Sequence, residues 1–276
     1  MKSITIIGAG AVGRSLALVF SRSGVTVSGI YSEHGRSAAS AAKKVKVKHF
    51  GTLEEFRADS SVIIIAVPDG RITDVSRTLA SLGSGLRGKI VLHTSGALSS
   101  DELSMLRKHG ASVGSFHPLQ TFPKSLPVTS MKNIWFALEG DDRAISVSRS
   151  LAKIIGARTF LLTKKNKTLY HIAAVFASNY QVALFSVVEE LSSVLDIPKH
   201  QLWNIFKPLI TQTLNNVFAT SPVEALTGPI ARGDYKTISK HLAVLEASKK
   251  MKHLIPLYST LGVETAKLAK RKNNAR

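Results

Sequence analysis

The sequence contains no cysteine, which excludes disulfide bonds, thiolate zinc sites and a cysteine nucleophile. It also lacks paired carboxylates at catalytic spacing, a nucleophile elbow, and histidines at metal-ligand spacing, so we expect neither glycosidase chemistry nor a metal site. Acidic residues are few: 18 Asp and Glu stand against 37 Lys and Arg, for a net charge of +19. The basic residues are dispersed, and no nucleic-acid-binding motif accompanies them. We therefore expect a basic surface that attracts an anionic cofactor and substrate, and no nucleic-acid partner.

The N-terminus shows no secretory signal pattern, and we expect no membrane span because no uncharged stretch approaches roughly 20 residues. These observations predict a soluble, cytoplasmic protein. The 276 residues, 44% of them hydrophobic, are enough for two domains with a substantial core.

A glycine-rich loop near the N-terminus has the spacing of a dinucleotide-binding fingerprint. The apolar run 4–7 ends in Gly8, Gly10 and Gly13, and a helical pattern follows at once. In such a loop the three glycines allow a tight turn, a close approach of backbone to pyrophosphate, and close packing of helix on strand. We predict that the whole loop binds a dinucleotide: Gly8, Ala9, Gly10, Ala11, Val12 and Gly13. The alternative is a glycine-rich turn without a ligand.

The residues after the expected second strand, 25–30, favour NADP over NAD. An acidic residue about 20 positions past the glycines bonds the ribose of NAD. Here Tyr31 and Ser32 occupy that place, with Arg36 nearby, and a hydroxyl plus an arginine suits a 2′-phosphate. In the alternative, Glu33 binds the ribose and Arg36 is an ordinary loop residue.

Later strands deliver polar residues to the edge of the sheet where the cofactor is expected. Residues 62–67 form a continuous apolar run, typical of a strand buried on both faces, so Val67, Pro68 and Asp69 should line the cofactor cleft. Strands at 89–92 and 111–116 precede Ser95 and the His117–Gln120 turn, and further strands are expected at 133–138 and 158–162.

His117 is a candidate acid/base, because a histidine with a pKa near neutrality can exchange a proton with a substrate hydroxyl. Ser95 and Gln120 could orient that substrate by hydrogen bonds. A structural role in a loop before proline is an equally good interpretation of His117, and His93 fits best as a buried histidine with its hydrogen bonds satisfied.

The composition changes near residue 163, and the rest of the chain has a helical pattern. We predict a dinucleotide-binding domain at 1–163 and an all-helical domain at 164–276, ending in a basic tail. The region 168–195 is apolar nearly all round, as in a helix at the centre of a bundle or dimer. His171, Ser178 and Asn179 on it either face the cleft or bond across a helix interface.

Four motifs resemble an uncharacterised bacterial family with a Rossmann-like domain followed by a helical domain of unknown function. They are HTSGAL (93–98), GSFHPLQTF (114–122), YHIAAVFASNY (170–180) and LTGPIARGD (226–234). The wider clan resembles prephenate dehydrogenase, pyrroline-5-carboxylate reductase and the beta-hydroxyacid dehydrogenases. The resemblance implies an α/β fold: a Rossmann-type parallel sheet followed by an all-α domain of the 6-phosphogluconate dehydrogenase C-terminal type. It also implies that the helical domain, 164–276, serves for substrate binding and dimerisation.

The resemblance also implies roles for residues. His117 matches by position the catalytic histidine of prephenate dehydrogenase, Ser95 is similar to its substrate-contacting serine, and His171 resembles a histidine on the helix that opens its second domain. The turn after His117-Pro118 departs from that enzyme, and Lys167 with Asn179 matches only loosely the lysine and asparagine of the beta-hydroxyacid dehydrogenases, so substrate identity does not transfer.

The combined hypothesis is a homodimeric NAD(P)-dependent oxidoreductase acting on a small, anionic substrate. His117 is its acid/base, Ser95, Gln120 and Asn179 orient the substrate, and His171 assists. The alternative is a non-catalytic NADP-binding sensor or scaffold.

Overall fold

The computed structural model describes residues 3–33, 39–40, 42–43, 48–50, 53, 60–82, 85–124 and 128–274. The chain divides into two compact units, Met1–Gln181 and Val182–Arg276. The sheet ends close to the predicted domain boundary at residue 163, whereas the first unit continues through helix α6 (Lys167–Ala177). Arg36, which the sequence analysis selected for the cofactor, lies outside the described residues.

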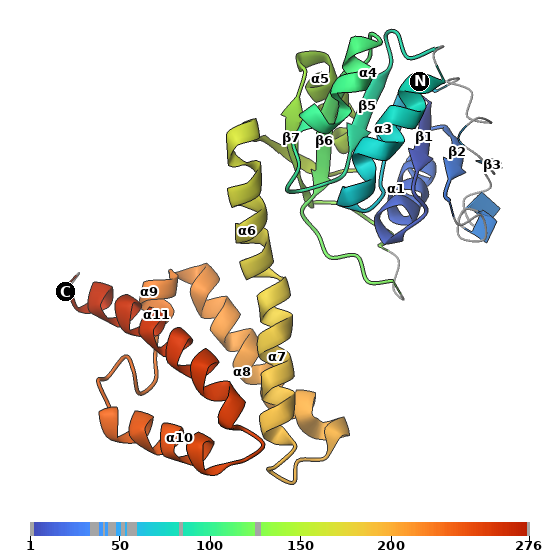
Figure 1. The fold of residues 1–276 in the computed structure, drawn as a ribbon. Coiled ribbons are helices and arrows are strands. Elements are labelled where there is room, and N and C mark those ends of the chain that lie inside the picture. The colour runs from blue at the N-terminus through green and yellow to red at the C-terminus, as the bar shows by residue number, and fades with distance from the viewer. Residues whose placement is uncertain are drawn as a thin grey trace. The chain divides into compact units, whose positions relative to one another are not determined.

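The first unit is built on a sheet whose strands run in the order β3-β2-β1-β4-β5-β6-β7-β8 (Figure 1). Neighbouring strands are parallel except for the antiparallel pair β6 and β7. The strands are β1 (Ile4–Ile7), β2 (Val27–Tyr31), β3 (Lys48–Phe50), β4 (Val62–Ile65), β5 (Ile90–His93), β6 (Ser112–Pro118), β7 (Trp135–Gly140) and β8 (Arg158–Leu161). Because β1, β4, β5 and β6 are parallel, their carboxyl ends meet at one edge of the sheet.

Helices cover both faces of this sheet, which makes it a doubly wound α/β domain. Helices α1 (Ala11–Arg22) and α5 (Asp142–Ile154) pack on one face, and α3 (Ile72–Ser81) and α4 (Ser104–Lys108) pack on the other. Strand β4 is fully buried, with alternate residues in the two cores, which explains its continuous apolar run. Short 3-10 helices η1 (Asp69–Arg71) and η2 (Ser100–Leu103) start just beyond the ends of β4 and β5.

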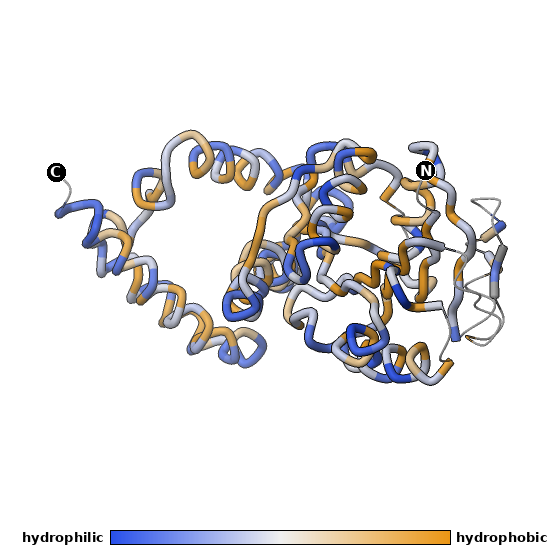
Figure 2. The backbone as a smooth tube through the Cα atoms, turned by 90° about the horizontal axis from the view of Figure 1, so that it is seen from above, coloured by the Kyte–Doolittle hydropathy of each residue, from blue (hydrophilic) through white to orange (hydrophobic). Residues whose placement is uncertain are grey.

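The remainder of the described chain, through residue 274, is helical, as predicted. After η3 (Lys164–Asn166) come α6, α7 (Asn179–Ser192), α8 (Lys199–Ala219), α9 (Pro222–Ala225), α10 (Tyr235–Ala247), η4 (Lys252–Leu254) and α11 (Ile255–Asn274). The single helix expected over 168–195 is interrupted at Ser178, whose backbone leaves the helical region at φ −132°. Helix α11 mixes hydrophobic and hydrophilic residues along its length and ends in a hydrophilic stretch (Figure 2).

One helical stretch, Lys164–Ser192, is long and apolar enough to cross a membrane by length and composition alone, which corrects our expectation that no stretch reaches that length. A single helix of this kind is weak evidence for a membrane span. Its large apolar side chains are exposed in the single chain, for example Leu169 at 68% and Phe176 at 61%. The residues 171, 178 and 179 on it carry polar side chains that a bilayer would leave without partners.

Candidate functional site

The glycine loop has a geometry that only glycine accommodates at two of its three positions. Gly8 has φ +107°, and a Cβ there would lie 2.3 Å from the carbonyl oxygen of Ala66. A Cβ on Gly13 would lie 1.9 Å from the carbonyl oxygen of Gly8. A Cβ on Gly10 would meet no atom within 4 Å, so this position is open on its outer side. The loop is therefore packed on the protein side and free on the ligand side.

The loop ends at the N-terminus of α1, which suits an anion. Gly10 is the N-cap and provides no side-chain hydrogen bond, and the first turn has no acidic residue. The first backbone N–H groups of a helix lack intrahelical partners and carry partial positive charge. The residues of the loop, with Ala9, Ala11 and Val12 between the glycines, thus fit a pyrophosphate.

The end of β2 places an ion pair beside this loop. The N–H of Gly8 donates to the carbonyl oxygen of Tyr31, the last residue of β2. Two residues later, the carboxylate of Glu33 receives Nη2 of Arg71 at 3.1 Å. Glu33 is therefore paired, while Ser32 lies between it and the strand.

The predicted cleft residues after β4 connect to Ser95 after β5. Val67 and Pro68 lead into η1, and Oδ2 of Asp69 accepts a hydrogen bond of 2.9 Å from the Ser95 hydroxyl. The same hydroxyl oxygen accepts the N–H groups of Ala97 and Leu98 at 3.2 and 3.0 Å. Ser95 is buried, and its hydroxyl is fully used within the protein, so it acts by holding this turn.

His93 is a satisfied core histidine, as one of our interpretations had it. Its Nδ1 accepts the N–H of Ser95 at 3.2 Å, and its Nε2 lies 3.0 Å from the carbonyl oxygen of Ser99. These contacts fix a neutral imidazole with the proton on Nε2. Burial, followed by the nearby Lys167 ammonium, lowers the pKa of His93 to about 3.

His117, at the end of β6, is held by a residue that the sequence analysis did not select. Its Nδ1 lies 2.9 Å from the phenol oxygen of Tyr170 on α6, and the two rings meet edge to face. Burial and then the charge of Lys167 lower the pKa of His117 to about 4, below the near-neutral value that we expected. His117 is accordingly a neutral imidazole at pH 7.

Gly96 brings His117 and His171 together. A Cβ on Gly96 would lie 2.8 Å from Nε2 of His117 and 2.8 Å from Nδ1 of His171. The two ring nitrogens therefore face the same bare stretch of backbone. Nδ1 of His171 is buried and has no hydrogen-bond partner among the described residues. An unsatisfied buried nitrogen beside a second imidazole is a feature typical of a functional site.

Lys167 holds this arrangement through two hydrogen bonds. From the sequence it was noted only as a loose match to the lysine of the beta-hydroxyacid dehydrogenases. Its side chain is 1% exposed, and Nζ donates to the carbonyl oxygen of Ser95 at 3.1 Å and to the hydroxyl of Ser115 at 2.6 Å. Burial lowers its pKa to about 8. The sequence signal was a lysine at the start of an otherwise apolar helix, but its burial depends on the turn after β5 and on strand β6, which the sequence pattern does not bring together.

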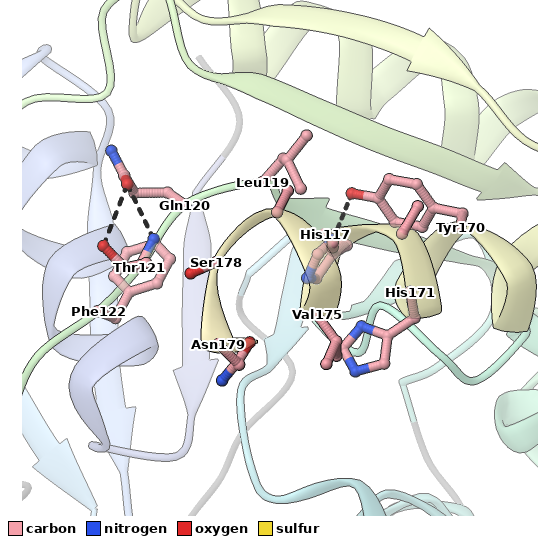
Figure 3. A pocket seen from close by; sticks show the side chains of 13 residues that line it. His117, Leu119, Gln120, Thr121, Phe122, Tyr170, His171, Val175, Ser178 and Asn179 are labelled. Carbon is pink, nitrogen blue, oxygen red and sulfur yellow. Dashed lines mark hydrogen bonds between the residues drawn. The ribbon is translucent and has the colours of Figure 1, made fainter. Parts of the chain in front are cut away.

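A cavity of about 820 Å³ opens on this cluster. Five residues selected from the sequence line it, together with Tyr170: His117, Gln120, His171, Ser178 and Asn179 (Figure 3). The amide oxygen of Gln120 is turned back to the N–H of Thr121 at 2.8 Å. The remaining lining is Leu119, Thr121, Phe122, Ala173, Ala174, Val175 and Ala177. Within the described part of the chain the lining combines apolar and polar side chains, and the polar ones are distributed along the cavity (Figure 3).

Comparison with protein-family models divides the chain in the same way. Residues 1–118 match the Rossmann-like domain, and residues 134–265 match the domain of unknown function DUF2520. The chain is a Rossmann-like domain followed by a DUF2520 domain. This confirms the fold class and the family that the motifs resembled. A search of curated proteins found no match.

Solved structures share this architecture along almost the whole chain. A "putative NADP oxidoreductase" from Bacteroides fragilis is 25% identical, with a TM-score of 0.80 over 96% of this chain and 98% of that one. A protein from Thermotoga maritima is 24% identical, with a TM-score of 0.73 over 98% and 99%. An imine reductase from Myxococcus stipitatus, determined with NADP+, is 17% identical, with a TM-score of 0.69 over 99% and 94%. The last two show a shared fold only.

Proposed function

We propose that this protein is an oxidoreductase that binds NADP(H) at the glycine loop and acts on a small substrate in the His117 pocket. The proposal depends on one observation, a continuous series of contacts along the carboxyl edge of the sheet. Gly8 packs against Ala66 at the ends of β1 and β4, and Asp69 beyond β4 bonds Ser95 beyond β5. The next residue, Gly96, lies against His117 and His171. Ligands bind at this edge in open parallel sheets.

The residues present fit the cofactor. The open face of Gly10 and the uncapped start of α1 would hold the pyrophosphate, and Tyr31, Ser32, Val67, Pro68 and Asp69 would surround the rest. When bound, the nicotinamide supplies or accepts a hydride. The choice of NADP is supported by the name of the Bacteroides protein. Arg36, which we expect to contribute to it, lies outside the described residues.

In this proposal the proton that accompanies hydride transfer moves through His117. Nε2 gives its proton to the substrate as Tyr170 passes the phenol proton to Nδ1, and water reprotonates Tyr170, so the imidazole of His117 stays neutral. Its Nδ1 is occupied by Tyr170, so Nε2 is the nitrogen left for substrate. His171 assists from beside His117, where its Nδ1 also lies against Gly96, and Asn179 and Gln120 orient the substrate. Ser95 does so indirectly, through the turn that it holds.

An anionic group on the substrate remains part of the proposal because the chain has a net charge of +19, which attracts anions to its surface. The described lining carries no Lys or Arg, so His171 and the backbone would have to receive that group. Comparing a carboxylate substrate with its methyl ester tests this point, since an anion site predicts slower turnover of the ester.

We also propose a homodimer formed through the helical part. Several large apolar side chains of α8 are exposed in the single chain, including Leu209 at 64% and Phe218 at 80%. Exposed apolar faces of this kind mark interaction surfaces. Light scattering coupled to size-exclusion chromatography should give twice the chain mass, and Phe218→Glu should shift it to the monomer.

The test of the activity is a screen of carbonyl and imine substrates with NADPH, followed by His117→Asn. We expect a loss of turnover of about 100-fold or more, the range for removing an acid/base group, with NADPH affinity unchanged. His109→Asn is the matched control, because His109 is the exposed C-cap of α4 and its ring contacts the carbonyl oxygen of Met105 in that helix. Unchanged turnover in His117→Asn would refute the assigned role. NADPH binding without turnover of any substrate would favour a non-catalytic sensor or scaffold.

A further inference from the structure

The pair Arg71–Glu33 lies where the adenosine ribose of a bound dinucleotide is expected. In this fold the ribose reaches the end of the second strand, next to the glycine loop. Gly8 and Tyr31 join that loop to β2 by a hydrogen bond of 2.8 Å. Glu33 follows Tyr31 by two residues, and Arg71 reaches it from η1, beyond β4. Two charged side chains, 38 residues apart in the chain, thus meet at this edge.

Glu33 alone would favour a ribose with free hydroxyls, because a carboxylate accepts hydrogen bonds from hydroxyls and repels a phosphate. The structure changes that reading, since one nitrogen of Arg71 contacts both carboxylate oxygens, at 3.1 and 3.3 Å. The pair is neutral overall. Nε and Nη1 of Arg71 make no further hydrogen bond within the described ranges, so the guanidinium retains donors for another anion.

The approach of Arg71 to this edge is fixed by the cluster around the pocket. Arg71 is the last residue of η1, and its N–H donates to the carbonyl oxygen of Pro68 at 2.8 Å. Asp69, at the start of η1, is held by the Ser95 hydroxyl. The backbone that carries Arg71 is therefore anchored at both ends of one helical turn.

The ion pair is also easily opened. The side chains of Arg71 and Glu33 are 54% and 66% exposed, and ion pairs at such exposure contribute little to stability. A phosphate with two negative charges offers the guanidinium a stronger and more geometrically suitable partner than one carboxylate. Replacing Glu33 by a phosphate as the partner of Arg71 should therefore change the stability of the fold little.

We propose that Arg71 binds the 2′-phosphate of NADPH, with Glu33 holding its guanidinium in place when no phosphate is there. The inference rests on the proposed dinucleotide site. It assigns the preference for the phosphorylated cofactor to a residue after β4, in addition to the loop after β2. In this proposal Glu33 positions the side chain of Arg71 and does not bind the ribose hydroxyls.

The test is the dissociation constant of NADPH and of NADH, measured by quenching of protein fluorescence or by calorimetry. Arg71→Gln should weaken NADPH by about 10- to 100-fold, the range for losing a charge-assisted contact, and NADH by less than about 2-fold. Arg77→Gln is the matched control, because Arg77 makes a similar exposed pair with Asp74 on α3. It should leave both constants unchanged. Melting temperatures without ligand show whether each variant is folded.

The outcomes separate this inference from the proposed function. If the wild-type protein binds neither cofactor, the proposed function fails. If it binds NADPH and Arg71→Gln does not alter the ratio of the two constants, the inference is overturned and the proposed function stands. An equal loss for both cofactors, or a wild-type preference for NADH that Glu33→Gln abolishes, also overturns the inference.

Discussion

The phenol oxygen of Tyr170 lies 2.9 Å from Nδ1 of His117, and this contact joins α6 to the end of β6. Burial raises the pKa of Tyr170 to about 12, so the phenol keeps its proton and can donate it to the imidazole. When Nδ1 accepts, the proton of the neutral ring is on Nε2, which faces Gly96 and His171. Tyr170 is in this sense a positioning residue for His117.

Replacing Tyr170 with Phe removes only the hydroxyl. We expect turnover to fall about 10-fold, as for one hydrogen bond of about 1.4 kcal/mol, and the Nδ1–H form of His117 to appear in nitrogen NMR spectra. Tyr180→Phe is the control, because the ring of Tyr180 packs against Phe176 outside the cluster. An unchanged tautomer ratio in Tyr170→Phe would show that the phenol does not determine which ring nitrogen of His117 carries the proton.

Replacing Lys167 with Met should raise the pKa of His117, because the nearby ammonium is one cause of its low value. It should also destabilise the fold by about 2 kcal/mol or more, since the buried oxygens of Ser95 and Ser115 lose a donor. The NMR titration of His117 and urea unfolding measure these two effects. The neighbouring exposed Lys165, changed to Met, should alter neither. A His117 pKa that stays near 4 would contradict the electrostatic argument.

Acid should destabilise this protein through two buried histidines. The folded pKa values of His93 and His117, about 3 and about 4, lie below the ordinary 6.5. The unfolded chain therefore binds more protons between those values, and the stabilisation present above pH 6.5 is lost as pH falls through 4. We expect a slope of roughly 1.4 kcal/mol per pH unit for each histidine in this window. Urea unfolding at a series of pH values measures it, and a flat profile from pH 7 to 4 would contradict it.

Alanine at Gly10 and at Gly13 should have opposite consequences. At Gly10 a methyl group meets nothing in the protein, so the melting temperature should hold while NADPH affinity falls at least about 10-fold, because the methyl occupies the ligand side. At Gly13 the methyl would lie 1.9 Å from a carbonyl oxygen, so the fold itself should be destabilised. Gly262→Ala is the control, because Gly262 lies in α11 and so shows the effect of the same substitution in a helix outside the loop. Equal NADPH affinity in Gly10→Ala and wild type would contradict the assignment of the pyrophosphate to this loop.

The sequence predicted most of the fold because its signals are local. The glycine spacing, the apolar run of β4 and the change of composition near residue 163 each depend on a few neighbouring residues. The ends of strands also placed Ser95 and His117 at one edge correctly. The contacts that define the cluster are not local: Tyr170 and Lys167 reach strands more than 50 positions away, and Arg71 meets Glu33 from another loop.

The pKa of His117 illustrates the same limit. Its residue type suggested titration near neutrality, whereas burial and the Lys167 charge decide the value in the folded chain. Ser95 is a second case, because a serine at a strand end suggests substrate contact, but its hydroxyl is used by Asp69 and two backbone N–H groups. Residue type indicates which chemistry is available, and packing decides whether it is exposed to a ligand.

The Ser95 hydroxyl has a kinetic consequence. It joins η1, which borders the dinucleotide loop, to the turn that ends under His117 and His171. A ligand that moves Asp69 must displace or release Ser95, and with it the peptide whose oxygen Lys167 holds. For the proposed oxidoreductase we therefore predict a compulsory order in steady-state kinetics, with the dinucleotide binding before the substrate.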